Sequence, residues 1–258
     1  MISKRYDMPA SFGPSTMPSA TTVEDALAAI ISFETDRDAI AALLPPQLTP
    51  AEQAIVSVAS IAYPTTDYMG GRGYNEIVVS LSAVHEGSQE SLSAGFAAVL
   101  WVDQFGALFA GREFQGLPKL LAEVSAPEPT GDGYRIGCTE YGAPLLKGEI
   151  GGLIPMPAER LDRIRQTSSA VPTFGWKYIP SASGEPDADY ATVNYTRWEY
   201  EQVWSGDGKV EFFMPTASEA PFGSRPCAGL AALPILRWRP AFVGRGKVVI
   251  DRSMTRRL

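Results

Sequence analysis

The sequence predicts a mainly β fold of the α+β class, in which an antiparallel sheet closes into a barrel or cone with a few short helices. Stretches rich in Val, Ile, Ser and Ala follow one another along the 258 residues, with partial period-two alternation. Turns that contain glycine separate them, and only three short stretches have helical character. Strands that succeed strands through tight turns favour antiparallel pairing over an alternating, parallel α/β arrangement.

The first 20 residues predict an extended N-terminal arm, and residues 21–258 predict a single domain. The arm contains three prolines outside any periodic pattern, Pro9, Pro14 and Pro18, and such segments are extended. From residue 54 to residue 251 the chain has no internal repeat, no linker and no shift in composition. One domain is therefore the simplest prediction.

Helix signals occur early in the chain. Residues 26–33 are apolar and fit either a strand or a helix. A helix is expected to begin at Thr35, which can cap it together with Asp38, and to end before Pro45-Pro46. Two further short helices are expected, over residues 103–112 and 157–167.

Strand signals cover most of the remaining chain. Ser205-Gly206-Asp207-Gly208 has the composition of a tight hairpin turn between two of these stretches. The expected strands are residues 54–63, 75–84, 93–102, 134–140, 173–179, 190–204, 209–214, 233–243 and 247–251.

The charge balance argues against a nucleic-acid partner. The chain has 22 basic and 29 acidic residues and a net charge of −7, whereas affinity for phosphates comes from clustered Lys and Arg. The closest approach to a basic cluster is Arg252, Arg256 and Arg257, which we interpret as a solvated end. No apolar run approaches the ~18 residues that a membrane-spanning helix needs. No apolar core of a signal peptide follows the N-terminus, so a cytoplasmic location without membrane contact is expected.

The chain is poor in residues that hold metals or redox cofactors. His85 is the single histidine, which excludes multi-histidine metal sites and leaves a catalytic triad without its usual sequence context. Cys138 and Cys227 are far apart and form no CxxC motif, so we interpret them as inert thiols. Two cysteines of this kind fit a reducing cytosol. We therefore predict neither a metal nor a cofactor.

Lys119 stands out among the six lysines because its neighbours are apolar. It follows Leu117-Pro118 and precedes Leu120, with no charge between Glu113 and Glu123. An amine in apolar surroundings loses the solvation of its ammonium form, so its pKa falls and a nucleophilic amine becomes available for a Schiff base. The alternative is that the side chain reaches out to water, as most lysines flanked by leucines do.

Several motifs together resemble the acetoacetate decarboxylase family. The segment from Gly111 to Lys119, GREFQGLPK, is similar to the Gly-Arg-Glu…Pro-Lys segment of that family. Further similarities follow the family's order and spacing over most of the chain. They are residues 9–14 (PASFGP), Thr35-Asp36 with Leu43-Leu44-Pro45, Tyr74-Asn75-Glu76, residues 177–180 (KYIP) and Trp204-Ser205-Gly206.

The resemblance implies a cofactor-free lyase that forms an imine between Lys119 and a small keto acid, in a homo-oligomer with the family's barrel-like fold. The imine would act as an electron sink when a bond at the adjacent carbon breaks or forms. Glu76 matches the family's motif glutamate and is the candidate general acid or base. The remaining candidates are substrate-binding Gln115, Tyr74, Leu117 and Leu120, and Arg112 and Glu113 as an ion pair that supports the loop before Lys119.

Two departures from the family pattern keep other functions open. Leu120 stands where the decarboxylases carry a second lysine, and a second family glutamate falls near Ala59. Gln115 could hold the carboxylate of a 2-oxo acid, as in family members that are aldolase-dehydratases acting on pyruvate. The alternatives to a decarboxylase are therefore an aldolase-dehydratase that condenses such an acid with an aldehyde, and a non-catalytic protein that binds a small molecule.

Overall fold

The computed structural model describes residue 11 and residues 17–87, 90–167 and 170–258. All of its strands belong to one sheet. The strands are β1 (Ala20–Glu34), β2 (Thr49–Pro50), β3 (Ile55–Tyr63), β4 (Tyr74–Glu86), β5 (Ser91–Val102), β6 (Lys119–Leu121), β7 (Glu123–Val124), β8 (Glu128–Pro129), β9 (Tyr134–Glu140), β10 (Ala143–Pro155), β11 (Val171–Ile179), β12 (Ala188–Phe212), β13 (Arg237–Trp238) and β14 (Ala241–Arg257). The helical elements are α1 (Arg37–Ala41), η2 (Asp67–Met69), α2 (Phe105–Phe109), η3 (Ala110–Gln115), α3 (Ala158–Thr167) and α4 (Ser224–Ala231).

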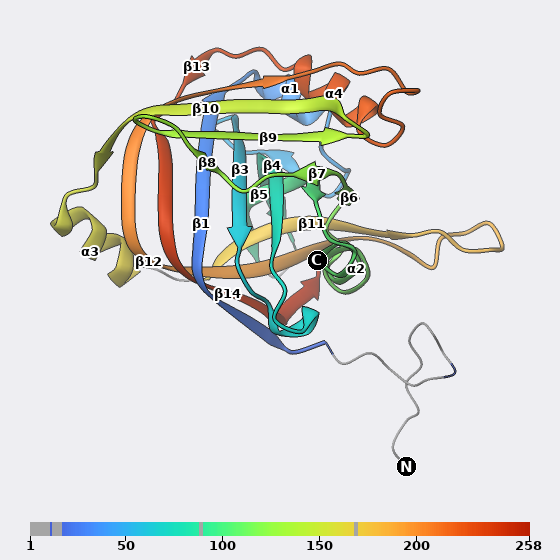
Figure 1. The fold of residues 1–258 in the computed structure, drawn as a ribbon. Coiled ribbons are helices and arrows are strands. Elements are labelled where there is room, and N and C mark those ends of the chain that lie inside the picture. Colours follow the sequence, from blue (N-terminus) through green and yellow to red (C-terminus); the bar gives the residue numbers. More distant parts are fainter. Residues whose placement is uncertain (1–10, 12–16, 88–89, 168–169) are drawn as a thin grey trace.

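The sheet closes on itself, which confirms the predicted mainly β, barrel-like fold. Its order is β11-β5-β4-β3-β1-β14-β12-β10-β9-β7, and β11 also pairs with β12, so that the first seven strands form a ring. β12 then continues past the ring and carries β10, β9 and β7, at the end of the molecule where α1 and α4 lie (Figure 1). Two of the pairs, β5–β11 and β5–β6, are parallel, so the sheet is mixed rather than purely antiparallel.

The predicted hairpin turn at residues 205–208 is wrong, because β12 runs through it without a break. Gly206 pairs with Ala241 of β14, and Gly208 pairs with Ile150 of β10. A Cβ atom on Gly206 would lie 2.4 Å from the carbonyl oxygen of Gly151. These glycines therefore allow neighbouring strands to approach closely, because glycine has no side chain in the way.

Two other local predictions need correction, and one open assignment is resolved. The cap of α1 is Asp36 rather than Thr35, because the Asp36 carboxylate accepts the backbone N–H groups of Asp38 and Ala39. The strand predicted over residues 233–243 is absent, and this region holds only the short β13 and the start of β14 after helix α4. The apolar stretch at 26–33, which fitted either class, is part of β1. Residues 1–10 and 12–16 of the predicted arm lie outside the described part of the chain.

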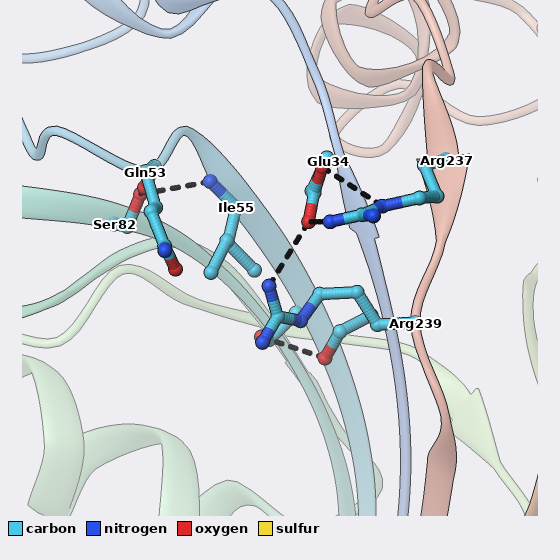
Figure 2. A network of polar contacts seen from close by, with 8 residues as sticks. Glu34, Gln53, Ile55, Ser82, Arg237 and Arg239 are labelled. Atoms are coloured by element: carbon cyan, nitrogen blue, oxygen red, sulfur yellow. Dashed lines mark hydrogen bonds and ion pairs between the residues drawn. The ribbon is translucent and has the colours of Figure 1, made fainter.

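A charged network fixes the end of β1 against β13 (Figure 2). Glu34 accepts two hydrogen bonds from Arg237, at 2.5 and 3.1 Å, and a third from Arg239 at 3.1 Å. Nearby, the Ser82 hydroxyl accepts the Ile55 N–H at 2.9 Å and so links β4 to the start of β3. Two-point contacts between a guanidinium and a carboxylate are strongly directional, so this network sets the position of β13.

The hydrophobic core consists of two clusters of buried residues. The larger cluster centres on buried residues such as Phe33, Trp101 and Phe174. The smaller one includes Tyr63 and Tyr74 and lies at the wall of the site described below. Among the described residues, no helix combines the length and the apolar character that crossing a bilayer requires.

Candidate functional site

A cavity of about 330 Å³ lies among the strands of the ring. Side chains at every second position of a strand share one face, and the lining residues of β1, β3, β4, β12 and β14 follow this rule. They are Ala28 and Ile30 on β1; Ala59, Ile61 and Tyr63 on β3; Tyr74, Glu76, Val78 and Ser80 on β4; Asn194, Thr196, Trp198 and Tyr200 on β12; and Ile250 and Arg252 on β14. Because the sheet closes into a ring, the inward-facing side chains of these strands surround a chamber of the size that small ligands occupy.

Lys119 reaches this cavity from the start of β6. The π-helical turn η3 ends at Gly116, whose φ of 70° is left-handed, and the chain then enters β6 in parallel register with Leu100 of β5. The Arg112 guanidinium donates to the Lys119 carbonyl at 3.2 Å. The whole lysine is only 5% exposed, so its side chain points into the protein and does not reach out to bulk water.

Gly111 makes room for the stem of this lysine. A Cβ atom at Gly111 would lie 2.5 Å from Cδ and 2.6 Å from Cε of Lys119, far closer than van der Waals contact. The glycine of the GREFQGLPK segment therefore serves the lysine directly, because any side chain there would displace it.

The amine of Lys119 meets a carboxylate and two tyrosines. Its Nζ lies 2.9 Å from Oε2 of Glu76, which is itself 6% exposed. The Tyr63 hydroxyl donates to the other oxygen, Oε1, at 3.0 Å. The Tyr74 ring stacks on Tyr63 at 4.5 Å, and its centroid lies 5.2 Å from Nζ. The Glu76 carboxylate is therefore held on both oxygens, and only one of them faces the amine.

The phenols around the cavity stay protonated near neutral pH. Burial, reinforced by the nearby Glu76 charge, raises the pKa of Tyr63 and of Tyr74 well above the usual value near 10. Burial also raises the pKa of Tyr68 and of Tyr200 to about 12. These groups therefore act as hydrogen-bond donors and not as anions, and the charged residue types on the cavity wall are Glu76, Lys119 and Arg252.

Gln115 and Leu117, two of the predicted substrate-binding residues, also line the cavity. The position of Gln115 is fixed through its backbone carbonyl, which accepts from the Thr192 hydroxyl at 2.8 Å and from the Asn194 amide at 3.1 Å. The structure thus brings together Lys119, Glu76, Tyr74, Gln115 and Leu117 from β4, η3, β6 and the link between η3 and β6.

Leu120, the last predicted substrate-binding residue, lies elsewhere. It lines a second and more open hollow of about 610 Å³, which Lys119 also borders, together with exposed side chains such as Phe105, Tyr141 and Phe222. We call this hollow the outer groove. Lys119 and Leu120 are successive residues of one strand, so their side chains point to opposite faces.

Arg112 and Glu113 do not form the predicted ion pair. Both are exposed, and each supports the loop through the backbone: Arg112 binds the Lys119 carbonyl, and the Glu113 carbonyl accepts from the Lys177 amine at 2.6 Å. Adjacent residues of a helical turn point in different directions, so a direct pair between them is unfavourable.

Tyr63 and Arg252 line the cavity, although no sequence pattern placed them there. Tyr63 lies in a stretch predicted as a strand, but nothing in its spacing indicates that it faces Glu76. Arg252, which we interpreted as part of a solvated tail, is a half-buried residue of β14 that lines the cavity. A period-two count back from Arg252 to Ile250 and Val248 would have placed it on the inward face.

Other candidates for chemistry are weak in the described part of the chain. No three His, Cys, Asp or Glu residues come together there in a way that could hold a metal ion. Both thiols are free and buried, and burial raises the pKa of Cys227 to about 12 and that of Cys138 further. A raised pKa leaves little thiolate at neutral pH, so neither cysteine is a ready nucleophile.

An enclosed cavity with convergent ionisable groups is the architecture of a small-molecule enzyme or binding protein. Comparison with known proteins makes this specific. Residues 7–249 match the family model of acetoacetate decarboxylase (ADC), so the chain belongs to the acetoacetate decarboxylase family. The acetoacetate decarboxylase of Paraburkholderia xenovorans (strain LB400) is 25% identical over 228 residues, which cover 86% of this chain and 83% of that protein. The predicted family and lyase class are confirmed.

Solved structures share the fold. An acetoacetate decarboxylase structure has a TM-score of 0.78 at 16% identity and covers 99% of this chain and 95% of that chain. The enduracididine biosynthesis enzyme MppR, solved with the condensation product of pyruvate and imidazole 4-carboxaldehyde, has a TM-score of 0.69 at 19% identity, with 98% and 95% covered. Identities this low establish a common architecture only.

Proposed function

We propose that this protein is a cofactor-free lyase that uses Lys119 to form an imine with a small keto acid. The observation that carries the proposal is the placement of the lysine: Lys119 is 5% exposed at the wall of a cavity, and its amine lies 2.9 Å from a buried carboxylate. Glu76 is the adjacent group to which Nζ can pass its proton. An unprotonated amine is what addition to a ketone requires.

The chemistry then follows from the imine. Nζ adds to the ketone carbon, and the resulting hydroxyl leaves as water after taking up a proton, for which Glu76 is the nearest carboxyl group. In a decarboxylase, the protonated imine accepts the electron pair of the bond to the carboxylate, and carbon dioxide leaves. The enamine takes up a proton on carbon, and water hydrolyses the imine to the ketone product and the free amine. Tyr63, protonated and bound to Glu76, keeps the carboxylate aimed at Nζ.

Gln115 favours a second candidate reaction at the same lysine. Its side chain lines the cavity, and an amide can bind a carboxylate that remains on the substrate. In that case the enamine of a 2-oxo acid attacks the carbonyl carbon of an aldehyde, and the adduct loses water. Product analysis with pyruvate and an aldehyde separates this aldolase-dehydratase activity from release of carbon dioxide.

Reductive trapping tests the proposal. Wild-type protein incubated with keto acids and cyanoborohydride is expected to gain a substrate-sized mass on the peptide that contains Lys119. Lys119→Ala is expected to gain none, while Lys177→Ala, a lysine that binds the Glu113 carbonyl outside the cavity, labels like the wild type. A panel that never labels Lys119, together with ligand binding that survives Lys119→Ala, would favour the non-catalytic binding protein instead.

The proposal includes a homo-oligomeric, cytoplasmic enzyme. Large apolar side chains around the outer groove are well exposed in the isolated chain, among them Tyr141 at 76% and Phe105 at 62%, and exposed apolar patches of this kind mark contact surfaces. The two free thiols fit a reducing compartment. Light scattering of the purified protein gives the number of subunits.

A further inference from the structure

We infer that Arg252 binds the carboxylate of the keto acid, and that this carboxylate stays on the substrate throughout the reaction. The inference rests on the imine chemistry proposed above and adds the class of substrate that the cavity selects. Arg252 projects from β14 and lines the same cavity as Lys119. It is the only arginine or lysine besides Lys119 on that wall within the described residues.

One side of the guanidinium is fixed by the protein. Nη1 of Arg252 donates to the Thr21 hydroxyl at 2.8 Å and to the Pro18 carbonyl at 3.3 Å. Thr21 in turn donates to the Asp67 carboxylate at 2.8 Å. Cζ lies 4.9 Å from the centroid of the Tyr68 ring, a cation–π arrangement. The head group is therefore held in one orientation before any ligand arrives.

The other side of the guanidinium lacks acceptors. Nε is buried without a hydrogen-bond partner, and the Nη1 contacts are the hydrogen bonds that the Arg252 side chain makes to the described residues. The nearby carboxylates are engaged elsewhere: Asp67 meets Arg252 only through Thr21, and Asp251 accepts from Ser253. Nη2 makes neither of the contacts that Nη1 makes, so it is the donor of the guanidinium that can bind a carboxylate in the cavity through a charge-assisted hydrogen bond.

A guanidinium without a counter-ion destabilises the folded protein, and it is free to bind an anionic ligand. Removing a charge from water without a counter-ion raises the free energy of the folded protein. No described Asp or Glu forms an ion pair with Arg252, although other surface arginines such as Arg245 and Arg237 have such partners. A bound carboxylate would supply the missing partner.

Two neighbouring tyrosines connect the Arg252 guanidinium with the Lys119 amine. Tyr68 lies under Arg252, and the Tyr74 ring lies 5.2 Å from the amine of Lys119. The two phenols are close enough to affect each other's pKa. A molecule with a ketone at one end and a carboxylate at the other can therefore engage Lys119 and Arg252 together.

The ion pair also decides which bond can break. Pairing with a guanidinium stabilises the carboxylate as an anion, whereas decarboxylation converts that anion into neutral carbon dioxide. An interaction that is stronger in the ground state than in the transition state slows the step. The carboxylate held by Arg252 is thus one that the reaction retains, which favours carbon–carbon bond formation by the enamine of an oxo acid.

Trapping with matched acids and esters tests the role of Arg252. Pyruvate and levulinate are compared with their methyl esters, in the presence of cyanoborohydride, on wild type and Arg252→Gln. The ratio of acid to ester labelling rates at Lys119 is expected to fall about 10- to 100-fold in the variant, the size expected for a lost charge-assisted contact. Ester labelling is expected to stay within about twofold. Arg256→Gln, on the same strand but paired with Glu90, is the control and keeps the wild-type ratio.

The outcomes distinguish failure of the Arg252 inference from failure of the proposed imine chemistry. An unchanged acid-to-ester ratio in Arg252→Gln overturns the inference while the imine chemistry stands. Failure of every ketone to label Lys119 overturns the proposed function itself. If Arg252→Gln does not fold by circular dichroism, Arg252→Lys, which keeps the charge but loses the Nη2 donor, is expected to lower the ratio several-fold. Wild-type protein that releases carbon dioxide from acetoacetate faster than it condenses pyruvate with benzaldehyde overturns retention of the carboxylate.

Discussion

Two hollows meet at strand β6, and they differ in what they offer to chemistry. The enclosed cavity measures about 330 Å³ and receives the Lys119 amine, while the outer groove measures about 610 Å³ and is lined by Leu120. The groove has almost twice the volume and also contacts Lys119, but its walls include exposed side chains such as Phe105 and Phe222. Glu76, the hydrogen-bond partner of the Lys119 amine, lines the cavity and not the groove.

The difference between the two hollows arises from a single step along the strand. Successive side chains of β6 point to opposite faces, so Lys119, only 5% exposed, enters the cavity, whereas the half-buried Leu120 lines the outer groove. Inside the cavity a carboxylate and an amine interact without competition from bulk water, and electrostatic contacts strengthen accordingly. The same pair of residues in the groove would be solvated and nearly indifferent to each other. Changes inside should therefore affect reactivity far more than equal changes outside.

Glu76→Gln is expected to have the largest effect. The amide keeps the shape of the side chain but cannot accept the proton of the Lys119 amine, so trapping of keto acids at Lys119 should slow about 10²- to 10⁴-fold, the usual range for a general acid or base. Single-turnover trapping followed by mass spectrometry measures this rate. The matched control is Glu123→Gln, the same change in the outer groove, which should leave the rate within about twofold. Equal effects of the two changes would contradict the contrast between the hollows.

Gly111→Ala is expected to disturb the cavity next most strongly. The new methyl group would meet Cδ and Cε of Lys119 at 2.5 and 2.6 Å, so the lysine must move and the unfolding free energy should fall by about 1–3 kcal/mol. Urea denaturation measures the stability, and trapping at Lys119 should slow as the amine leaves its place beside Glu76. A Cβ atom on Gly131 meets nothing within 4 Å, so Gly131→Ala is the control and should change neither. Wild-type stability and reactivity in Gly111→Ala would mean that the cavity is looser than described.

Leu120→Ala is expected to have the smallest effect on reactivity. Leu120 packs partly against the larger core cluster and faces the groove, so the truncation should cost about 1 kcal/mol or more of stability. The rate of trapping at Lys119 should change less than about threefold. A larger change in rate at unchanged stability would mean that Leu120 contacts the substrate, as its position beside the lysine predicts from the sequence.

The sequence was informative wherever a pattern is local. Alternation predicted β3, β4, β5 and β9 to within a few residues, because half-buried strands need apolar side chains at every second position. It failed at residues 205–208, where two glycines serve close strand packing instead of a turn, and at helix α4, whose sequence SRPCAGLA contains an internal proline and glycine. A glycine or proline in the sequence indicates that the local backbone is constrained. It does not indicate which neighbouring segment imposes the constraint.

By itself the sequence determined the mainly β class, the family motifs and the identity of an apolar-flanked lysine and a motif glutamate. Only the tertiary structure decided that Lys119 and Glu76 touch, that Tyr63 holds the second carboxylate oxygen, and that Arg252 belongs to the cavity instead of a solvated tail. These residues come from β6, β4, β3 and β14, which are distant in the chain and meet because the sheet closes. Ring closure is a long-range event, so no window of sequence short enough to show a pattern contains both sides of the cavity.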